Sequence, residues 1–234
     1  MGDRRDLQLS AFSFYIKRRV RVNVSFYFFA VAAVIALSDK SGMLLMGLLS
    51  AGLHEAGHLT AMLLLPGHAP TEISLTPFGL KIRSSPLAAF AKGNLVVLAA
   101  GSGVNLALAA FFYALSSLAP LFSRFPVFFN HSDFSFFSFS SSFSRFASLN
   151  LVMGAVNLLP VDSLDGGGLL RLLLRRFLSD RACDNVMTAV SLVTLTVMAF
   201  AGFTVLLRTR YNFTLLGMSL CLLFSLLLRL FSRC

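Results

Sequence analysis

The stretch that decides the fold is MLLMGLLSAGLHEAGHLTAMLLL, residues 43–65. A helix rises about 1.5 Å per residue, so a segment of this length crosses the roughly 30 Å hydrocarbon core of a bilayer. The stretch is apolar except at His54, Glu55 and His58. Since an ionisable side chain at membrane depth costs about 2.5–3.5 kcal/mol, these three groups need partners. We therefore predict a membrane helix that carries a polar site.

The composition of the whole chain agrees with a membrane setting. Of its 234 residues 56% are hydrophobic and 13% are charged, and the mean hydropathy is +0.79. Too few polar side chains remain to cover a water-soluble surface, which excludes a soluble enzyme. The three cysteines form no CxxC pair, so we expect neither a structural disulfide nor a thiolate zinc site.

Uncharged runs predict six membrane spans and an all-α polytopic membrane protein that forms one membrane-embedded domain over residues 1–234. The runs cover residues 22–38, 43–65, 93–122, 146–161, 186–207 and 211–228. With the N-terminus inside, 15 Lys and Arg fall in inside segments and 5 in outside loops. Because basic residues stay on the cytoplasmic side, both termini are predicted to be cytoplasmic in the cell membrane. The positions of the basic residues explain the net charge of +10 without nucleic acid.

Three connections between these spans have a character of their own. Alternating apolar residues predict a short strand or hairpin at about residues 72–83, after the second span. Residues 120–146 form a Ser- and Phe-rich tract that we interpret as an interfacial loop. A Gly-rich turn after the short fourth span leads into a predicted cytoplasmic helix at about residues 166–178.

The H-E-x-x-H pattern of His54, Glu55 and His58 indicates a catalytic zinc ion. Residues four apart share one helical face, so both imidazoles can reach one metal at roughly 2.0–2.1 Å. Glu55 lies about 100° round the helix from His54, beside the metal, where it can take a proton from a water molecule. A proton relay or a pair of hydrogen-bonding histidines would not need Glu55 at this spacing.

A catalytic zinc ion needs a third protein ligand and an open position. Asp165 is the favoured candidate, because it follows the fourth span on the predicted cytoplasmic side. Asp162 is the rival, and spacing alone does not separate the two. His68 lies beyond Pro66, and His131 falls on the opposite membrane side by the charge count, so neither is attractive.

These residues resemble the site-2 proteases, a family of polytopic zinc metalloproteases that cut substrates at or within the membrane. His54 to His58 match the family's metal helix, and residues 157–167, NLLPVDSLDGG, resemble its N-x-x-P-x-x-x-L-D-G pattern. The resemblance implies that Asp165 is the third ligand and that Asn157 contacts the substrate. The stretch AGSGVN, residues 100–105, resembles the family's A-G-P-x-x-N, which makes Asn105 a second candidate for substrate binding. An amide in a span also often bonds only a neighbouring helix.

The resemblance is greatest to the branch of stage IV sporulation protein FB, on the residues TPFG at 76–79 and the six spans. It implies zinc-dependent cleavage of a membrane-associated regulatory protein, such as a sigma-factor precursor or an anti-sigma factor. A membrane regulatory partner is a further expectation. Two alternatives stay open, namely a transporter or relay of protons or metal built on the His and Glu cluster, and another membrane H-E-x-x-H protease with a different third ligand.

Overall fold

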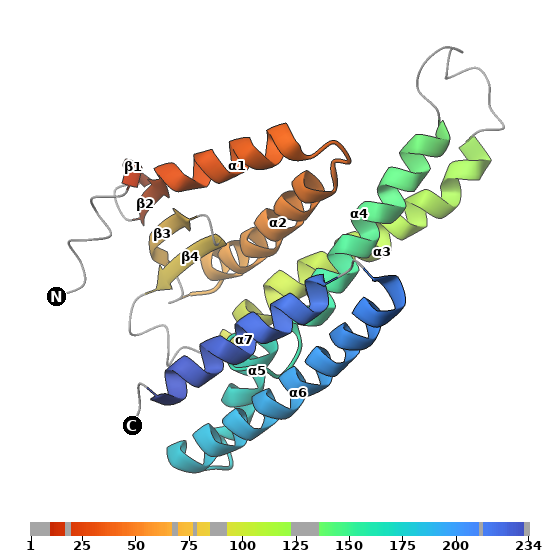
Figure 1. Cartoon of the computed structure of the whole chain (residues 1–234). Helices are drawn as coiled ribbons and strands as arrows, with labels where there is room; N and C mark the ends of the chain where they lie inside the picture. The colour runs from red at the N-terminus through yellow and green to blue at the C-terminus, as the bar shows by residue number, and fades with distance from the viewer. Residues whose placement is uncertain are drawn as a thin grey trace. The chain divides into compact units, whose positions relative to one another are not determined.

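The chain forms two compact units, residues 1–155 and residues 156–234 (Figure 1). The computed structural model describes residues 10–16, 20–66, 70–76, 79–84, 93–122, 136–210 and 213–231. Within these residues it contains seven helices and four strands. The predicted mostly helical architecture is thus confirmed, while the single domain stays a prediction.

The first unit contains a four-stranded sheet in the order β1-β2-β3-β4. β1 (Ser10–Ile16) pairs antiparallel with β2 (Val20–Ser25), and β3 (Pro70–Thr76) pairs antiparallel with β4 (Gly79–Ser84). β2 and β3 are parallel, which needs a crossover, and helices α1 and α2 provide it. The predicted hairpin at residues 72–83 is therefore half of a larger sheet.

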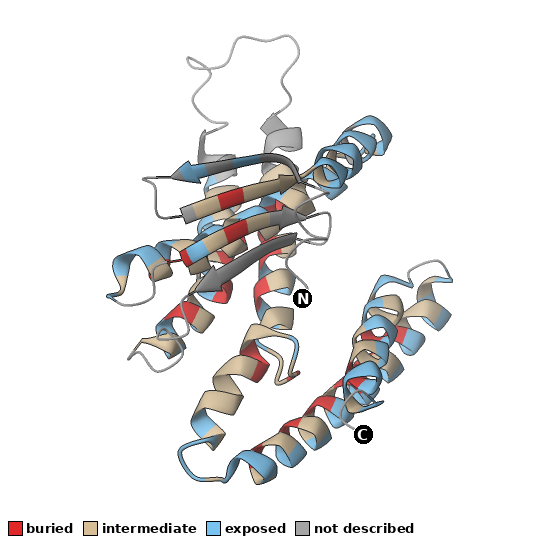
Figure 2. Cartoon of the chain, turned by 90° about the vertical axis from the view of Figure 1, so that its left-hand side faces the viewer, coloured by how far each residue is buried: buried red, intermediate tan, exposed pale blue. Residues whose placement is uncertain are grey.

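Buried valine and isoleucine side chains lie on the two middle strands of the sheet. Val22 on β2 is paired with Ile73 on β3 in the parallel register, and the two are 6% and 7% exposed. Figure 2 shows a buried stretch on each of two neighbouring strands of the sheet. This pairing corrects the predicted first span, because residues 22–25 are strand and α1 runs only over Phe26–Ser38. β-branched residues alternate at the start of that apolar run, which favours strand over helix.

Three long helices of the first unit pack closely against one another. They are α2 (Met43–Leu64), α3 (Asn94–Phe122) and α4 (Phe136–Asn157). A Cβ atom on Gly57 of α2 would lie 2.8 Å from the carbonyl oxygen of Ala100 on α3, so glycine lets the two backbones approach. Ser50 of α2 donates a hydrogen bond to Asn150 of α4 (2.9 Å), and both side chains are fully buried.

Helix α4 begins ten residues earlier than the span predicted for it. Residues 136–146 of the Ser- and Phe-rich tract are helical, not loop, and residues 123–135 lie outside the described part of the chain. The physical reason is the spacing of its aromatic residues. Phe143 and Phe146 share one face of α4 and pack on Phe112 of α3, with ring centroids 5.3 and 5.0 Å apart.

The second unit consists of α5 (Asp165–Leu174), α6 (Asp180–Thr209) and α7 (Thr214–Phe231). Its apolar core contains Val161, Leu195, Met198 and Leu226. α5 takes the place of the predicted helix at residues 166–178 and ends four residues sooner.

Long helices of both units expose apolar side chains and bury polar ones. Val193, Phe200 and Phe224 are 63%, 73% and 63% exposed, whereas Ser50, Asn150 and Ser191 are fully buried. Among the described residues, three helices are long and apolar enough to cross a membrane, namely Asn94–Leu118 of α3, Asp180–Thr209 and Thr214–Phe231. This distribution indicates a membrane protein.

The remaining three of the six predicted spans are not confirmed. α1 has 13 residues, fewer than the roughly 17–25 residues typical of a membrane-spanning helix. α2 has 22 residues but carries His54, Glu55 and His58, which lower its hydropathy. Serine residues have the same effect in α4.

Candidate metal centre

Helix α2 brings the two predicted histidine ligands together on its buried side. His54 is 6% exposed, and the buried residues of α2, namely Ser50, His54, Gly57 and Ala61, follow the helical repeat. His58 is partly buried, one turn after His54. Glu55 is also partly buried and follows His54 in the chain. The order of the motif along the helix thus places two imidazoles and a carboxylate within one turn.

The geometry of the histidine pair suits a shared tetrahedral metal ion. The Nε2 atoms of His54 and His58 lie 3.2 Å apart. Two ligand atoms bound at roughly 2.0–2.1 Å to a tetrahedral ion are themselves about 3.3 Å apart. The two imidazole planes are nearly perpendicular, at 86°. The donor set, two imidazoles in a protein interior, is one that zinc prefers.

The tautomer of His58 is fixed by a backbone carbonyl group of α3. Nδ1 of His58 lies 2.7 Å from the oxygen of Val97, and a carbonyl oxygen can only accept, so Nδ1–H is the donor. The neutral ring then has its lone pair on Nε2, the atom that faces His54. Metal-binding histidines are commonly oriented by such a second hydrogen bond.

Gly101 of α3 leaves the space that the two imidazoles occupy. A Cβ atom at this position would lie 2.3 Å from Nε2 of His58 and 2.8 Å from Cε1 of His54. Any larger residue would therefore have to displace the imidazoles. Only a glycine lets α3 approach this closely to the histidine pair.

Asp165, the predicted third ligand, is the first residue of α5 in the second unit. It is not the N-cap, since Leu164 holds that position in an extended conformation with no side-chain cap. A carboxylate in the first turn is favoured by the helix dipole. Asp165 is partly buried, and its role as a ligand stays a prediction.

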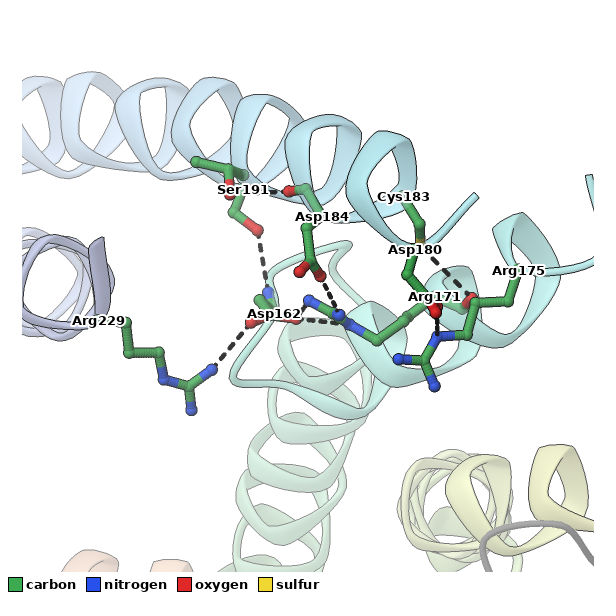
Figure 3. A network of polar contacts seen from close by, with 9 residues as sticks. Asp162, Arg171, Arg175, Asp180, Cys183, Asp184, Ser191 and Arg229 are labelled. Atoms are coloured by element: carbon green, nitrogen blue, oxygen red, sulfur yellow. Dashed lines mark hydrogen bonds and ion pairs between the residues drawn. The ribbon is translucent and has the colours of Figure 1, made fainter. Parts of the chain in front are cut away.

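Asp162, the rival ligand, has both carboxylate oxygens engaged by arginines (Figure 3). Oδ1 accepts from Nη2 of Arg171 (2.7 Å) and Oδ2 from Nη1 of Arg229 (2.9 Å). Arg171 also pairs with Asp184. Burial disfavours the charged guanidinium, but hydrogen bonds from Arg171 to Asp162 and Asp184 outweigh it and raise the pKa of Arg171 above its ordinary value. These ion pairs make Asp162 the less suitable metal ligand.

The two candidate substrate-binding amides lie in different surroundings. Asn157 is the last residue of α4 and is partly buried. Asn105 on α3 is fully buried, and neither atom of its amide group has a hydrogen-bond partner among the described residues. Buried polar groups seldom stay unsatisfied without a reason. The substrate-binding role of each residue stays a prediction.

Several residues that shape these surroundings were not predicted from the sequence. They are Val97 and Gly101 around the histidines, and Arg171, Asp184 and Arg229 around Asp162. For Gly101 a usable signal existed, because the A-G-P-x-x-N pattern that residues 100–105 resemble has a glycine at this position. A backbone carbonyl group gives no sequence signal. His68 and His131 lie outside the described residues.

A comparison with protein-family models gives a match in the second half of the chain. The model of peptidase family M50 matches residues 124–200, about a third of the chain. That segment contains Asn157, Asp162 and Asp165 but not the histidine pair, so the match does not depend on the H-E-x-x-H motif. Among curated proteins, none matches this chain.

A structural comparison covers nearly the whole chain. The solved structure of the site-2 protease from Methanocaldococcus jannaschii aligns with a TM-score of 0.56 at 20% sequence identity. The alignment covers 92% of this chain and 93% of that one. The chain therefore has the fold of a site-2 protease.

Proposed function

We propose that this protein is an intramembrane zinc metalloendopeptidase. The observation that carries the proposal is the histidine pair of α2, with Nε2 atoms 3.2 Å apart and with His58 oriented by the carbonyl group of Val97. A pair of this geometry, next to a glutamate in an apolar helix, suits a catalytic zinc ion. The match to peptidase family M50 and the fold support the same activity.

In this proposal the ion is held by His54, His58 and Asp165. Two imidazoles and one carboxylate form a known ligand set of catalytic zinc and leave the fourth position open for water or substrate. Asp162 is not part of the set, because Arg171 and Arg229 engage its carboxylate. Bound zinc would supply a Lewis acid that polarises the scissile carbonyl group and lowers the pKa of water toward 7.

Glu55 then acts as the general base. Its carboxylate accepts one proton of the attacking water and later delivers a proton to the leaving amine, so that one water is consumed per peptide bond. The amide of Asn157 holds the extended substrate or the developing oxyanion, and Asn105 is a second contact. β4 is the last strand of the sheet, and an unwound substrate segment can add to this part of the sheet as a further strand.

The membrane arrangement that we propose has six spans, with both termini in the cytoplasm. The excess of Lys and Arg in the predicted inside segments, 15 against 5, supports this orientation in the cell membrane. The substrate would be a membrane-associated regulatory protein, such as a sigma-factor precursor or an anti-sigma factor. A membrane partner could regulate the cleavage, as the resemblance to the stage IV sporulation protein FB branch implies.

The test is co-expression with candidate single-span proteins, scored for a metal-dependent size shift of the substrate. Glu55→Gln should abolish cleavage while zinc stays bound, because the general base is lost and the ligands are kept. Glu72 is the only other glutamate of the chain and provides the matched control. Since Glu72 lies in the sheet and accepts a hydrogen bond from Asn23, Glu72→Gln should leave cleavage intact.

Two outcomes would contradict the proposal. Cleavage that persists in Glu55→Gln would remove Glu55 from its role as base. Zinc or proton movement across vesicles by the wild-type chain, with no cleavage of any candidate, would instead indicate a transporter or relay.

A further inference from the structure

Asp162 lies in the loop between α4 and α5 and forms hydrogen bonds with residues of all three helices of the second unit (Figure 3). Arg171 of α5 donates to Oδ1 through Nε (3.1 Å) and Nη2 (2.7 Å). Arg229 of α7 donates to Oδ2 (2.9 Å). The backbone N–H of Asp162 donates to Oγ of Ser191 on α6 (3.0 Å).

The charges around Asp162 balance and are partly withdrawn from solvent. Two arginines, Arg171 and Arg229, pair with two carboxylates, Asp162 and Asp184. The side chains of Asp162 and Arg171 are 16% and 22% exposed. Removing one member of a shielded ion pair leaves its partner uncompensated. The four residues, here termed the Asp162 cluster, therefore favour one arrangement of the loop.

The backbone on both sides of Asp165 is constrained as well. Before it, Val161 is 1% exposed in the apolar core of the second unit. After it, a Cβ atom on Gly166 would lie 2.1 Å from the oxygen of Leu158, and one on Gly167 would lie 2.0 Å from the oxygen of Val161. The first turn of α5 thus packs directly against the backbone of the loop, without side chains between them. Arg171 lies between one and two turns further along α5 and connects this helix to the loop through its ion pair with Asp162.

We propose that Asp162 is a positioning residue that holds the carboxylate of Asp165 in the orientation needed to bind the metal. The inference rests on the proposed metal site, and it adds a role for a carboxylate that the proposed chemistry does not use. The loop would stay folded without Asp162, since Val161 and the two glycines still pack, but the direction of Asp165 would be less well defined. Mutation of a group that bonds a metal ligand directly typically lowers metal affinity about 10- to 100-fold, and Asp162 acts one step further out, through the loop.

The test is a double-mutant cycle on zinc affinity, measured on the purified full chain by chelator competition with zinc alone. Asp162→Asn should weaken zinc binding about 10-fold, the lower end of that range, because Asp162 acts on Asp165 through the loop. In an Asp165→Ala background the same substitution should change nothing further, because Asp162 acts only through Asp165. Thermal unfolding of the metal-free variants, measured in parallel, reports any general loss of stability.

Two further variants keep the test decisive. Arg175→Gln is the matched control, because Arg175 pairs with Asp180 at 3.5 Å on the exposed side of the same unit, and zinc affinity should not change. Should Asp162→Asn fail to fold, Arg229→Gln removes one ion pair only and should weaken zinc binding in the same direction by a smaller factor.

The inference is overturned if wild-type chain binds zinc and Asp162→Asn binds it equally well. It is also overturned if Asp162→Asn weakens zinc binding equally with and without Asp165, which would indicate a general structural effect. Normal zinc affinity in Asp165→Ala, with loss in Asp162→Asn, would make Asp162 the ligand itself. A cycle that behaves as expected in a chain that cleaves nothing would uphold the inference while the proposed protease activity failed.

Discussion

The two regions proposed to supply metal ligands hold these ligands in position by different interactions. In the first unit, His58 is oriented by an uncharged backbone carbonyl group, and a glycine of α3 leaves room for the imidazoles. In the second unit, the loop before Asp165 is held by a cluster of two arginines and two aspartates. One region is positioned by close backbone approach and the other by charge.

The difference follows from the ligands themselves. An imidazole binds metal as a neutral group, and a neutral carbonyl partner fixes its tautomer without adding a charge within an apolar helix pair. A carboxylate binds as an anion on a loop that must turn sharply, and arginines can hold such a loop where part of the cluster remains exposed to solvent. We expect the first region to respond to added volume and the second to loss of charge.

The largest effect is expected from Gly101→Ala. The added Cβ would lie 2.3 Å from Nε2 of His58, so the imidazole must leave its place and zinc affinity should fall by more than about 100-fold, beyond the usual effect of an outer contact. Equilibrium zinc binding, with helix content from circular dichroism, measures the change.

Gly103→Ala is the matched control for this prediction. It lies two residues away on α3, and a Cβ atom there has no neighbour within 4 Å among the described residues. Both substitutions bring the same gain in helix propensity, about 1 kcal/mol. Equal zinc affinity in the two variants would show that space at Gly101 does not control the histidine pair.

Smaller effects are expected from Asn105→Leu, which should raise the stability of the chain and lower its cleavage activity. The amide of Asn105 is fully buried without a hydrogen-bond partner among the described residues, so leucine should raise the free energy of unfolding by about 1–3 kcal/mol. If Asn105 contacts the substrate, cleavage should fall by roughly 10-fold or more at the same time. Thermal unfolding and cleavage rates on one preparation measure both.

Asn150→Leu provides the contrast, because Asn150 is equally buried but accepts from Ser50 and donates to the carbonyl group of Phe146. It should destabilise the chain by about 1–3 kcal/mol. A loss of stability in both variants would mean that Asn105 has a partner in the folded protein. Higher stability of Asn105→Leu with undiminished cleavage would exclude the substrate contact.

The sequence predicts what depends on local spacing and misses what depends on distant segments. Histidines four residues apart share a helix face wherever the helix lies, so the pairing of His54 and His58 was predictable. The helical fold and the resemblance to site-2 proteases were also predictable from the apolar runs and the two motifs. The assignment of Val20 to Ser25 to a sheet was not, because the parallel partner strand lies about 50 residues away and the valines merge with the following apolar run.

The choice between Asp162 and Asp165 also depends on residues that are distant in the sequence. Spacing alone could not decide between Asp162 and Asp165, since the arginines that engage Asp162 come 9 and 67 residues later in the chain. Gly101 and the carbonyl group of Val97 depend on the depth at which α3 packs on α2, which no local pattern encodes.

The smallest effect concerns Asp39, a carboxylate of the first unit that is held by backbone groups instead of arginines. Its Oδ2 accepts from the N–H of Leu45 in the first turn of α2 (2.9 Å), and Oδ1 accepts from the hydroxyl group of Ser41 (2.9 Å). The hydrogen bond from Leu45, with smaller contributions from Ser41 and Leu44, holds the pKa of Asp39 below its ordinary value despite some desolvation. Uncharged backbone and hydroxyl donors can therefore hold a carboxylate as well.

Because its pKa is lower in the folded chain, Asp39 stabilises the fold above its unfolded pKa of about 3.9, and this contribution is lost as pH falls through the folded value. Asp39→Asn should lower the unfolding temperature slightly at pH 7, and the difference from wild type should shrink below about pH 4. Lys40→Gln, on the same exposed turn, should show no such narrowing. A difference that stays constant down to pH 3 would mean that the charge of Asp39 does not contribute to the stability of the fold.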